Sequence, residues 1–228
     1  MGKIIGIGGG RYENGEIENI AAKIVSFCNK SNPAVVFLPT AGFDDMNGDE
    51  PIFDVFRKYG CTVTPLLLTD KSLTYEEIEN KILSADIIYA GGGNLKFLMD
   101  TWKETGADKA LKKAFEKGII CSGYSSGMMC WFAEGYDDCG ENREFMFVDC
   151  LGILPYGSCP HFEGGSWPTF EQAVSGRKYS AFAMENGAAL IYDEGKKSVI
   201  CGNEGGMVYF FDKEKGHKKE IFGGEPQI

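Results

Sequence analysis

The sequence predicts an α/β protein whose mostly parallel sheet is covered by helices on both faces. Short unbroken apolar runs alternate with segments of helical apolar spacing, and a glycine or proline cluster follows several of the runs. Strands that are continuously apolar are typical of parallel sheets buried on both sides. Because no linker, repeat or low-complexity tract divides the 228 residues, we expect a single domain over residues 1–228.

The parallel part of the sheet is expected in the first half of the chain. Apolar runs predict five strands, at residues 3–7, 34–38, 61–68, 86–90 and 119–122. Helical spacing predicts helices at residues 16–27, 52–59 and 74–85, from the glycine cluster at 91–94 through residue 99, and at 107–117. Thr74 and Glu77 form a capping box, which marks the start of the third helix.

The pattern changes after residue 133. Residues 134–168 are rich in glycine, proline, aspartate and aromatic residues, so we expect long surface loops there. A helix is expected near residues 167–178, and short strands at 182–184, 188–192, 198–201 and 207–211. The hairpin-length spacing of these strands predicts an antiparallel C-terminal addition to the edge of the sheet.

Composition excludes several classes of protein. The 33 acidic and 23 basic residues give a net charge of -10, which argues against nucleic-acid binding. No apolar run approaches 18 residues, so no membrane span is expected. The short, glycine-rich start does not resemble a secretory signal, which favours the cytoplasm. The eight cysteines are scattered without a Cys-x-x-Cys pair, so we expect reduced thiols and no metal site.

The segment Gly123-Tyr124-Ser125-Ser126-Gly127 contains a Gly-x-Ser-x-Gly motif centred on Ser125. An apolar strand precedes it and a helical stretch at residues 126–132 follows, which is the setting of a nucleophile elbow. The N-terminus of a helix favours a developing oxyanion. Ser122 and Ser126 are alternative nucleophiles, but neither lies at the centre of the motif.

A nucleophilic serine requires a base, and the chain has two histidines. His161 lies in a turn-like loop, whereas His217 lies in a charged stretch that is typical of solvated surface. An acid should orient the imidazole, and Glu185 is a candidate at the end of a predicted strand. Asp137 and Asp138, shortly after the elbow, are alternatives.

Four motifs occur in order, namely Gly91-Gly92-Gly93-Asn94, the Gly-x-Ser-x-Gly segment, Pro160-His161-Phe162 and Met184-Glu185-Asn186. With these motifs the chain resembles the peptidase E and cyanophycinase family of serine peptidases. The resemblance implies a flavodoxin-like three-layer sandwich related to class I glutamine amidotransferases. It also implies that Ser125 is the nucleophile, His161 the base and Glu185 the third member of a triad.

The same resemblance suggests how substrate is bound. The N–H of Gly92 or Gly93 would join that of Ser126 in an oxyanion hole, and Asn94 in this loop would contact substrate. Members of the family cleave dipeptides with an N-terminal aspartate or an aspartate–arginine polymer. We therefore expect a serine peptidase for small acidic peptides; the alternatives are a cyanophycinase-like hydrolase and a non-catalytic ligand-binding member.

An acidic substrate needs a cation in the pocket, and arginine suits a carboxylate because its fork binds both oxygens. Of the four arginines, Arg177 lies between His161 and Glu185 in the sequence and is the expected substrate-binding residue, while Arg11 and Arg143 lie in loops that could face the site. The expected partners are a small peptide and, as one option, a second copy in a homodimer.

The glycine cluster at residues 8–10 follows a strand, as a dinucleotide fingerprint does. Arg11 stands at the third fingerprint position, which argues against a nucleotide cofactor, and no other cofactor is expected. Ligands of parallel sheets bind outside the carboxyl ends of the strands. We therefore expect this cluster to line the same end of the sheet as Ser125.

Overall fold

The computed structural model describes residues 1–12, 15–162, 167 and 169–225. Its first sheet has seven strands in the order β11-β10-β1-β5-β4-β2-β3. The strands are β1 (Lys3–Ile7), β2 (Ala34–Leu38), β3 (Thr62–Pro65), β4 (Ile87–Ala90), β5 (Ile120–Tyr124), β10 (Ala188–Asp193) and β11 (Lys196–Cys201). The first five are parallel, and β10 and β11 extend the sheet antiparallel from β1, as predicted. The strands expected at 182–184 and 207–211 also form, but they pair with each other in a second sheet, so the expectation that they extend this edge was wrong.

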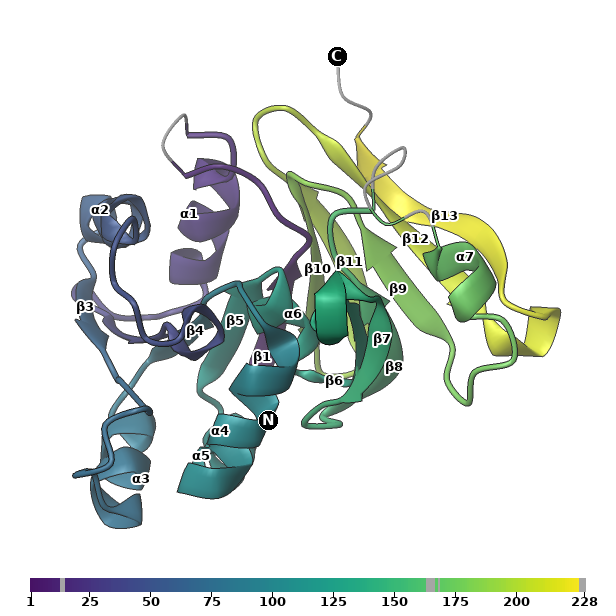
Figure 1. Cartoon of the computed structure of the whole chain (residues 1–228). Coiled ribbons are helices and arrows are strands. Elements are labelled where there is room, and N and C mark those ends of the chain that lie inside the picture. The colour runs from purple at the N-terminus through teal and green to yellow at the C-terminus, as the bar shows by residue number, and fades with distance from the viewer. Residues whose placement is uncertain (13–14, 163–166, 168, 226–228) are drawn as a thin grey trace.

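Helices cover both faces of this sheet (Figure 1). The helices are α1 (Glu18–Ser26) and α2 (Glu50–Lys58) on one face, and α3 (Tyr75–Leu83), α4 (Leu95–Thr105) and α5 (Ala107–Glu116) on the other. Successive residues of β1 show the two cores, because Ile4 packs with α4 and α5 while Ile5 packs with α1 and α2. The capping box of Thr74 and Glu77 begins α3.

A second sheet lies beside the first, with six strands in the order β13-β12-β9-β8-β6-β7 (Figure 1). Its strands are β6 (Phe132–Asp137), β7 (Met146–Asp149), β8 (Leu154–Cys159), β9 (Ala181–Met184), β12 (Gly206–Asp212) and β13 (Lys218–Glu225). The expectation of loops at residues 134–168 was wrong, because three of these strands fall there. Tyr136 and other aromatic residues of this segment pack on α7 (Phe170–Ala173), so they stabilise strands rather than loops.

Two helix predictions near the site were too long. The short helix α6 (Ser126–Met129) ends before β6, whereas a helical stretch at residues 126–132 was expected. Likewise α7 covers only part of the helix expected at 167–178, of which residue 168 lies outside the described residues. Three short 3-10 helices, η1 (Thr40–Gly42), η2 (Glu141–Arg143) and η3 (Lys213–Lys215), complete the fold.

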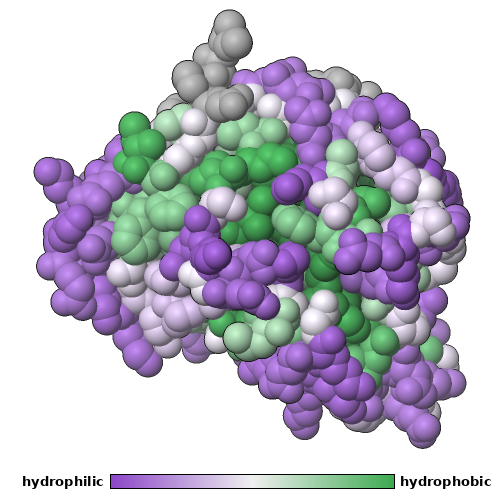
Figure 2. Space-filling model, turned by 180° about the vertical axis from the view of Figure 1, so that it is seen from behind, coloured by the Kyte–Doolittle hydropathy of each residue, from purple (hydrophilic) through white to green (hydrophobic). Residues whose placement is uncertain are grey.

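The rear face of the molecule is mainly hydrophilic (Figure 2). In the view from behind, hydrophilic residues cover most of the face and a hydrophobic band crosses its middle (Figure 2). Within the described ranges, no helix has both the length and the apolar character needed to span a bilayer.

The carboxyl ends of the parallel strands determine where the site forms. The loops after β1, β2, β4 and β5 all leave the sheet at this end, and they include the glycine cluster after β1 and Ser125 after β5. Loops at this end of a parallel sheet form the usual ligand-binding crevice.

Candidate active site

Ser125 occupies the turn between β5 and α6, as the motif predicts. Its backbone has φ 54° and ψ −124°, a conformation that is strained for a residue other than glycine. The N–H of Ser125 donates a hydrogen bond to the carbonyl oxygen of Ile7, at 3.1 Å. The strain is therefore held in place by the neighbouring strand β1.

Both glycines of the motif are required by close backbone contacts. A Cβ on Gly127 would lie 2.1 Å from the carbonyl oxygen of Ala90, at the end of β4. A Cβ on Gly123 would lie 2.3 Å from the carbonyl oxygen of Gly127. Such distances are much shorter than van der Waals contact, so only glycine lets the elbow form beside β4.

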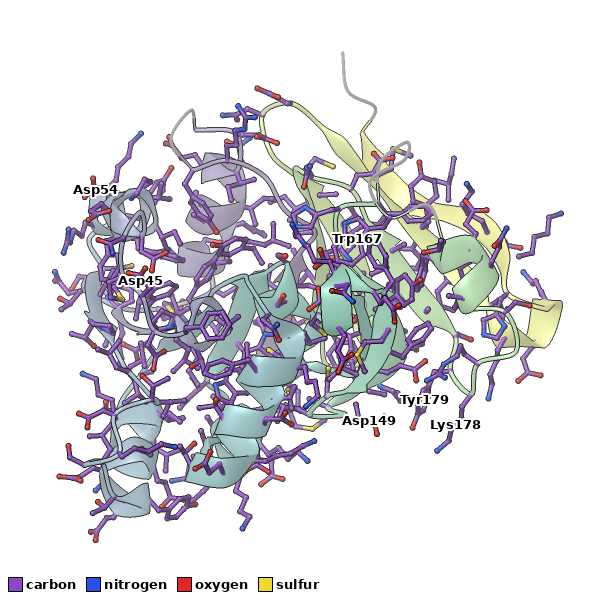
Figure 3. All side chains as sticks on the ribbon, viewed as in Figure 1. Asp45, Asp54, Asp149, Trp167, Lys178 and Tyr179 are labelled. Carbon is purple, nitrogen blue, oxygen red and sulfur yellow. The ribbon has the colours of Figure 1, made fainter. Side chains whose placement is uncertain are left out.

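His161 lies against Ser125. Its Nε2 is 2.9 Å from Ser125 Oγ, and its ring lies almost parallel to that of Trp167, with 6.0 Å between centroids and 17° between planes. Trp167 lies near the middle of the molecule, between the helices and the second sheet (Figure 3). The arrangement brings a hydroxyl and an imidazole within hydrogen-bonding distance, as a nucleophile and its base require.

The glycine cluster after β1 supports His161. The N–H of His161 donates to the carbonyl oxygen of Gly8 at 3.1 Å, and a Cβ on Gly9 would lie 2.4 Å from His161 Nδ1. These contacts place the cluster at the same end of the sheet as Ser125, as expected. They also explain the glycine at residue 9, because a side chain there would collide with the imidazole.

The residue bonded to Nδ1 of His161 is Asn186, whose Oδ1 lies 2.7 Å away. An amide oxygen only accepts hydrogen bonds, so Nδ1 carries the proton and the lone pair of Nε2 faces the hydroxyl of Ser125. Sequence reasoning missed Asn186, although it is the last residue of the Met184-Glu185-Asn186 motif.

The expected orienting residue, Glu185, has other partners. Its carboxylate accepts hydrogen bonds from the N–H of Met207 and from the hydroxyl of Tyr209, both at 2.9 Å. Both residues follow the end of β9, and of the two side chains it is that of Asn186 that contacts His161. Here the structure differs from the Ser-His-Glu expectation.

The two alternative acids are also engaged elsewhere. Oδ2 of Asp137 accepts the N–H of Leu95 at 2.8 Å, at the start of α4. Burial raises the pKa of the Asp137 carboxyl. Asp138 forms an ion pair with Arg143, with 2.7 Å between Oδ2 and Nη2. The structure therefore places both carboxylates near the site, but in other roles than the orientation of His161.

The rival serines and the second histidine have structural contacts. Ser122 is buried and its Oγ donates to the carbonyl oxygen of Ile5 at 2.8 Å, while Ser126 Oγ donates to that of Gly93 at 2.6 Å. The expectation that His217 is solvated was wrong. It is buried, and its Nε2 lies 2.8 Å from the carbonyl oxygen of Tyr179. The strand β13 begins at the next residue.

The glycine loop after β4 lies beside the nucleophile. A Cβ on Gly92 would lie 3.1 Å from Cβ of Ser125, and the bond from Ser126 Oγ holds Gly93 against the elbow. Ser126 is the first residue of α6, so its N–H has no acceptor within that helix. The residues expected to form an oxyanion hole are therefore brought together around Ser125.

Ser125 opens onto a hollow of about 380 Å3. It is lined by Gly93, Ser125, Asp137, Asp138, Arg143, Phe145, His161 and Trp167. The hollow thus brings together the candidate nucleophile Ser125, the candidate base His161, two acids and one arginine. That size suits a few residues of a peptide rather than a folded protein.

The structure does not place the two expected substrate-binding residues at this hollow. Arg177 donates from Nε and Nη2 to the carboxylate of Glu134, whose side chain is only 3% exposed, and its guanidinium lies 4.1 Å from the ring centre of Phe147. Asn94 accepts the N–H of Phe97 at 2.8 Å and caps α4. Arg143 lines the hollow instead, in a turn of two left-handed residues, and its expected place in a loop was the only hint of this in the sequence.

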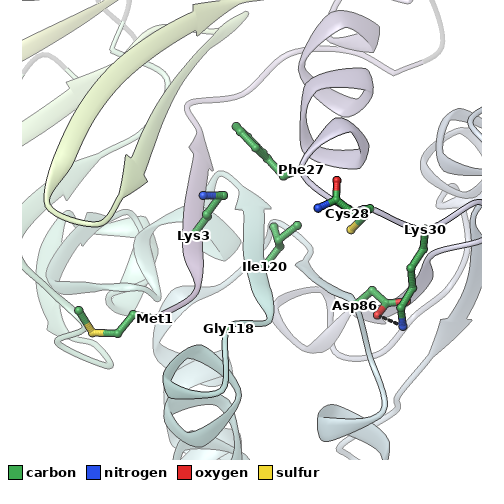
Figure 4. Close-up of a pocket in the computed structure, with 9 residues that line it drawn as sticks. Met1, Lys3, Phe27, Cys28, Lys30, Asp86, Gly118 and Ile120 are labelled. Atoms are coloured by element: carbon green, nitrogen blue, oxygen red, sulfur yellow. Dashed lines mark hydrogen bonds and ion pairs between the residues drawn. The ribbon is translucent and has the colours of Figure 1, made fainter.

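A separate hollow lies at the opposite, amino end of the strands (Figure 4). Its charged groups are paired, Lys30 with Asp86 at 2.6 Å and Lys3 with Asp193 at 2.5 Å. Burial raises the pKa of the Cys28 thiol to about 11, so this sulfur is a poor nucleophile at neutral pH. The chemistry-bearing groups are therefore concentrated at the carboxyl end.

Comparison with known proteins agrees with the resemblance seen in the sequence. The model for peptidase family S51 matches residues 4–200. Uncharacterized peptidase YgaJ of Bacillus subtilis (strain 168) is 32% identical over 195 residues, which cover 83% of this chain and 83% of that protein.

Two solved structures share the fold. One from Listeria monocytogenes EGD-e, which carries the peptidase E name, is 19% identical with a TM-score of 0.68 and covers 88% of this chain and 98% of its own. A peptidase from an acI-B1 actinobacterium is 16% identical with a TM-score of 0.70, covering 99% and 97%. At this identity they confirm the predicted flavodoxin-like fold alone.

The ion pair of Arg177 generates a prediction about stability. Arg177→Met should lower the free energy of unfolding by about 2 kcal/mol, because it leaves the buried Glu134 carboxylate unpaired, while water at the half-exposed arginine moderates the cost. Urea unfolding measures this loss, and the double variant Glu134→Gln/Arg177→Met should recover part of it. If Arg177→Met instead lost activity only on acidic peptides and kept its stability, the result would show that Arg177 binds substrate.

Proposed function

The chain belongs to peptidase family S51 and is a serine-type peptidase, and on this premise we propose that Ser125 and His161 are its catalytic pair. The observation that carries the proposal is the 2.9 Å contact between Ser125 Oγ and His161 Nε2, at a strained elbow facing a hollow. Ser122 and Ser126 have hydroxyls bonded to backbone carbonyls, which favours Ser125 as the nucleophile.

The geometry supports acyl transfer in two steps. Ser125 Oγ attacks the scissile carbonyl carbon as His161 Nε2 takes its proton, and the N–H groups of Gly93 and Ser126 bind the oxyanion. The C–N bond then breaks and the proton passes from Nε2 to the leaving amine. A water molecule, deprotonated by the same Nε2, cleaves the acyl ester and restores the Ser125 hydroxyl.

Asn186 takes the orienting role in this proposal, in place of Glu185. Its amide oxygen accepts the proton of Nδ1 and selects the tautomer in which Nε2 is the base. Glu185 then acts as a positioning residue, because its bonds to Met207 and Tyr209 hold the segment that carries Asn186. A neutral orienting residue is compatible with catalysis, since some cysteine peptidases use an asparagine behind their histidine.

For the substrate, we propose small acidic peptides, read by Arg143 rather than Arg177. Arg143 lines the hollow that contains Ser125, and its side chain is 84% exposed. Its Nε and Nη2 bond one carboxylate oxygen of Asp138. The guanidinium fork has five N–H donors, so its Nη1 side can bind a substrate carboxylate while that ion pair persists.

Loss of either member of the catalytic pair should abolish turnover. Ser125→Ala and His161→Ala are each expected to lower kcat by roughly 10³-fold or more, because nucleophile and base act as one unit. A fluorophosphonate probe should label the wild type and the control Ser84→Ala, but not Ser125→Ala. A wild type that resists the probe would favour the non-catalytic, ligand-binding alternative.

Substitutions at Asn186 and at its neighbour Glu185 test which of the two orients His161. Asn186→Leu should lower kcat about 100-fold with little change in KM, because the imidazole loses its tautomer and orientation. Asn186→Asp, which keeps an acceptor oxygen, should recover much of the activity, and Glu185→Gln should cost far less than Asn186→Leu. Steady-state kinetics measure all three; a silent Asn186→Leu beside a damaging Glu185→Gln would restore the Ser-His-Glu triad.

The substrate assignment is tested with peptides that differ only in aspartate or asparagine at the cleavage site. Arg143→Gln should lower kcat/KM for the aspartyl peptide about 10-fold, a modest factor because water screens an exposed pair. The asparaginyl peptide should be almost unaffected. Arg57→Gln, on α2, is the matched control. Equal losses on both peptides would exclude Arg143 as the reader of the carboxylate.

A further inference from the structure

A second hollow adjoins the one at Ser125. Its volume is also about 380 Å3, and Gly93, Asp138 and Arg143 line both hollows. The ion pair of Asp138 and Arg143 therefore lies along the boundary between them. On its far side the second hollow is lined by Ala41, Phe43 and Asn94 among other residues, so the expected substrate-binding residue Asn94 lies at this hollow rather than at the first. Because the two hollows share walls, a peptide bound at Ser125 can extend from one into the other.

Phe43 is the unusual member of this second hollow. Its side chain is 59% exposed and its φ is 62°, a left-handed conformation that is rare for a bulky residue. Asp44 is also left-handed, with φ 58°, and its Oδ2 accepts the N–H of Thr69 at 2.7 Å. The left-handed backbone and the exposure of an apolar ring to water both lower the stability of the fold. Backbone strain of this kind clusters at ligand-binding sites, and exposed apolar groups often mark them.

The ring of Phe43 has one aromatic neighbour. It lies 4.4 Å from the ring of Phe97, centroid to centroid, with 43° between planes. Phe97 is fixed because it lies in the first turn of α4, which Asn94 caps. The pair forms an apolar platform that is rigid on the Phe97 side and open to solvent on the Phe43 side.

We propose that this second hollow is an apolar subsite for the acyl part of the peptide, which binds the side chain of the residue that precedes the acidic residue. The assignment rests on the proposed function. His161 must protonate the leaving amine, so the leaving residue lies toward His161 and Trp167. The acyl part then extends past Gly93, where Arg143 meets the acidic side chain and Phe43 the residue before it. The substrate class becomes short peptides with an apolar residue before the acidic one.

The test uses acetylated peptide p-nitroanilides, in which the leaving group is constant. Acetyl-Phe-Asp and acetyl-Ala-Asp p-nitroanilides should differ about 10-fold in kcat/KM, in favour of phenylalanine, as is usual for an apolar pocket. Phe43→Asn removes the ring but tolerates the left-handed backbone, and it should abolish this ratio. Ile221→Asn, which replaces a 68% exposed apolar residue on β13, is the matched control and should keep it.

The outcomes separate this proposal from the one on which it rests. If acetyl-Phe-Ala p-nitroanilide is cleaved as fast as its aspartyl counterpart and the phenylalanine preference persists, the subsite stands and the acidic substrate class falls. Equal rates for the phenylalanyl and alanyl substrates of the wild type would overturn the subsite. So would a Phe43→Asn variant that alters selectivity only when the leaving residue is varied. If Phe43→Asn fails to fold, Phe97→Leu serves in its place, because it removes the second ring of the platform. This variant must reduce the preference for the phenylalanyl over the alanyl substrate.

Discussion

The close approach of the serine elbow to the end of β4 is the constraint on which the rest of the site depends. The carbonyl oxygen of Ala90 occupies the space that a Cβ on Gly127 would need, so α6 can begin there only with glycine at that position. This contact holds Ser125 in its strained conformation above the carboxyl ends of the strands. The bond from Ser126 Oγ to Gly93 joins the loop after β4 to the same elbow. Together with the hydrogen bond from the Ser125 N–H to Ile7 of β1, these contacts position the proposed nucleophile and the backbone N–H groups proposed for the oxyanion.

The proposed base, His161, follows a strand of the second sheet. His161 follows β8 and Asn186 follows β9, and these strands are parallel neighbours in the second sheet. The first sheet meets them through the loop after β1, where Gly8 accepts the N–H of His161 and Gly187 donates to Gly9. The distance between Oγ and Nε2 therefore depends on how the two sheets are joined. One of the two strands at this junction, β8, lies in a segment whose composition resembles that of loops.

The parallel sheet and the pairing of Ser125 with His161 as candidate site residues could be predicted because their physical signals are local. A strand buried on both faces is continuously apolar, and the elbow and a choice between two histidines are visible in the sequence. The second sheet could not be predicted, because Pro155 and Gly157 break the apolar pattern of β8 in the sequence. The aromatic residues that pack on this sheet are also distant from one another in the chain. Asn186 was missed because a carboxylate is the usual candidate for orienting a histidine, and Glu185 stands directly beside it in the sequence. Arg177 was preferred to Arg143 on sequence position, which says nothing about side-chain direction.

The balance of charge in the hollow gives a physical reason for a neutral residue behind His161. Asp137 and Asp138 already line the hollow that would receive an acidic substrate, and Arg143 is its arginine. A third carboxylate there would add repulsion against the substrate, and like charges in a partly buried site cost several kcal/mol. Burial raises the pKa of the Asp137 carboxyl, and the ion pair with Arg143 offsets the charge of Asp138. Orientation of the imidazole requires only an acceptor oxygen, which Asn186 supplies without further charge. A neutral amide behind His161 is therefore the orienting group that fits the proposed acidic substrate best.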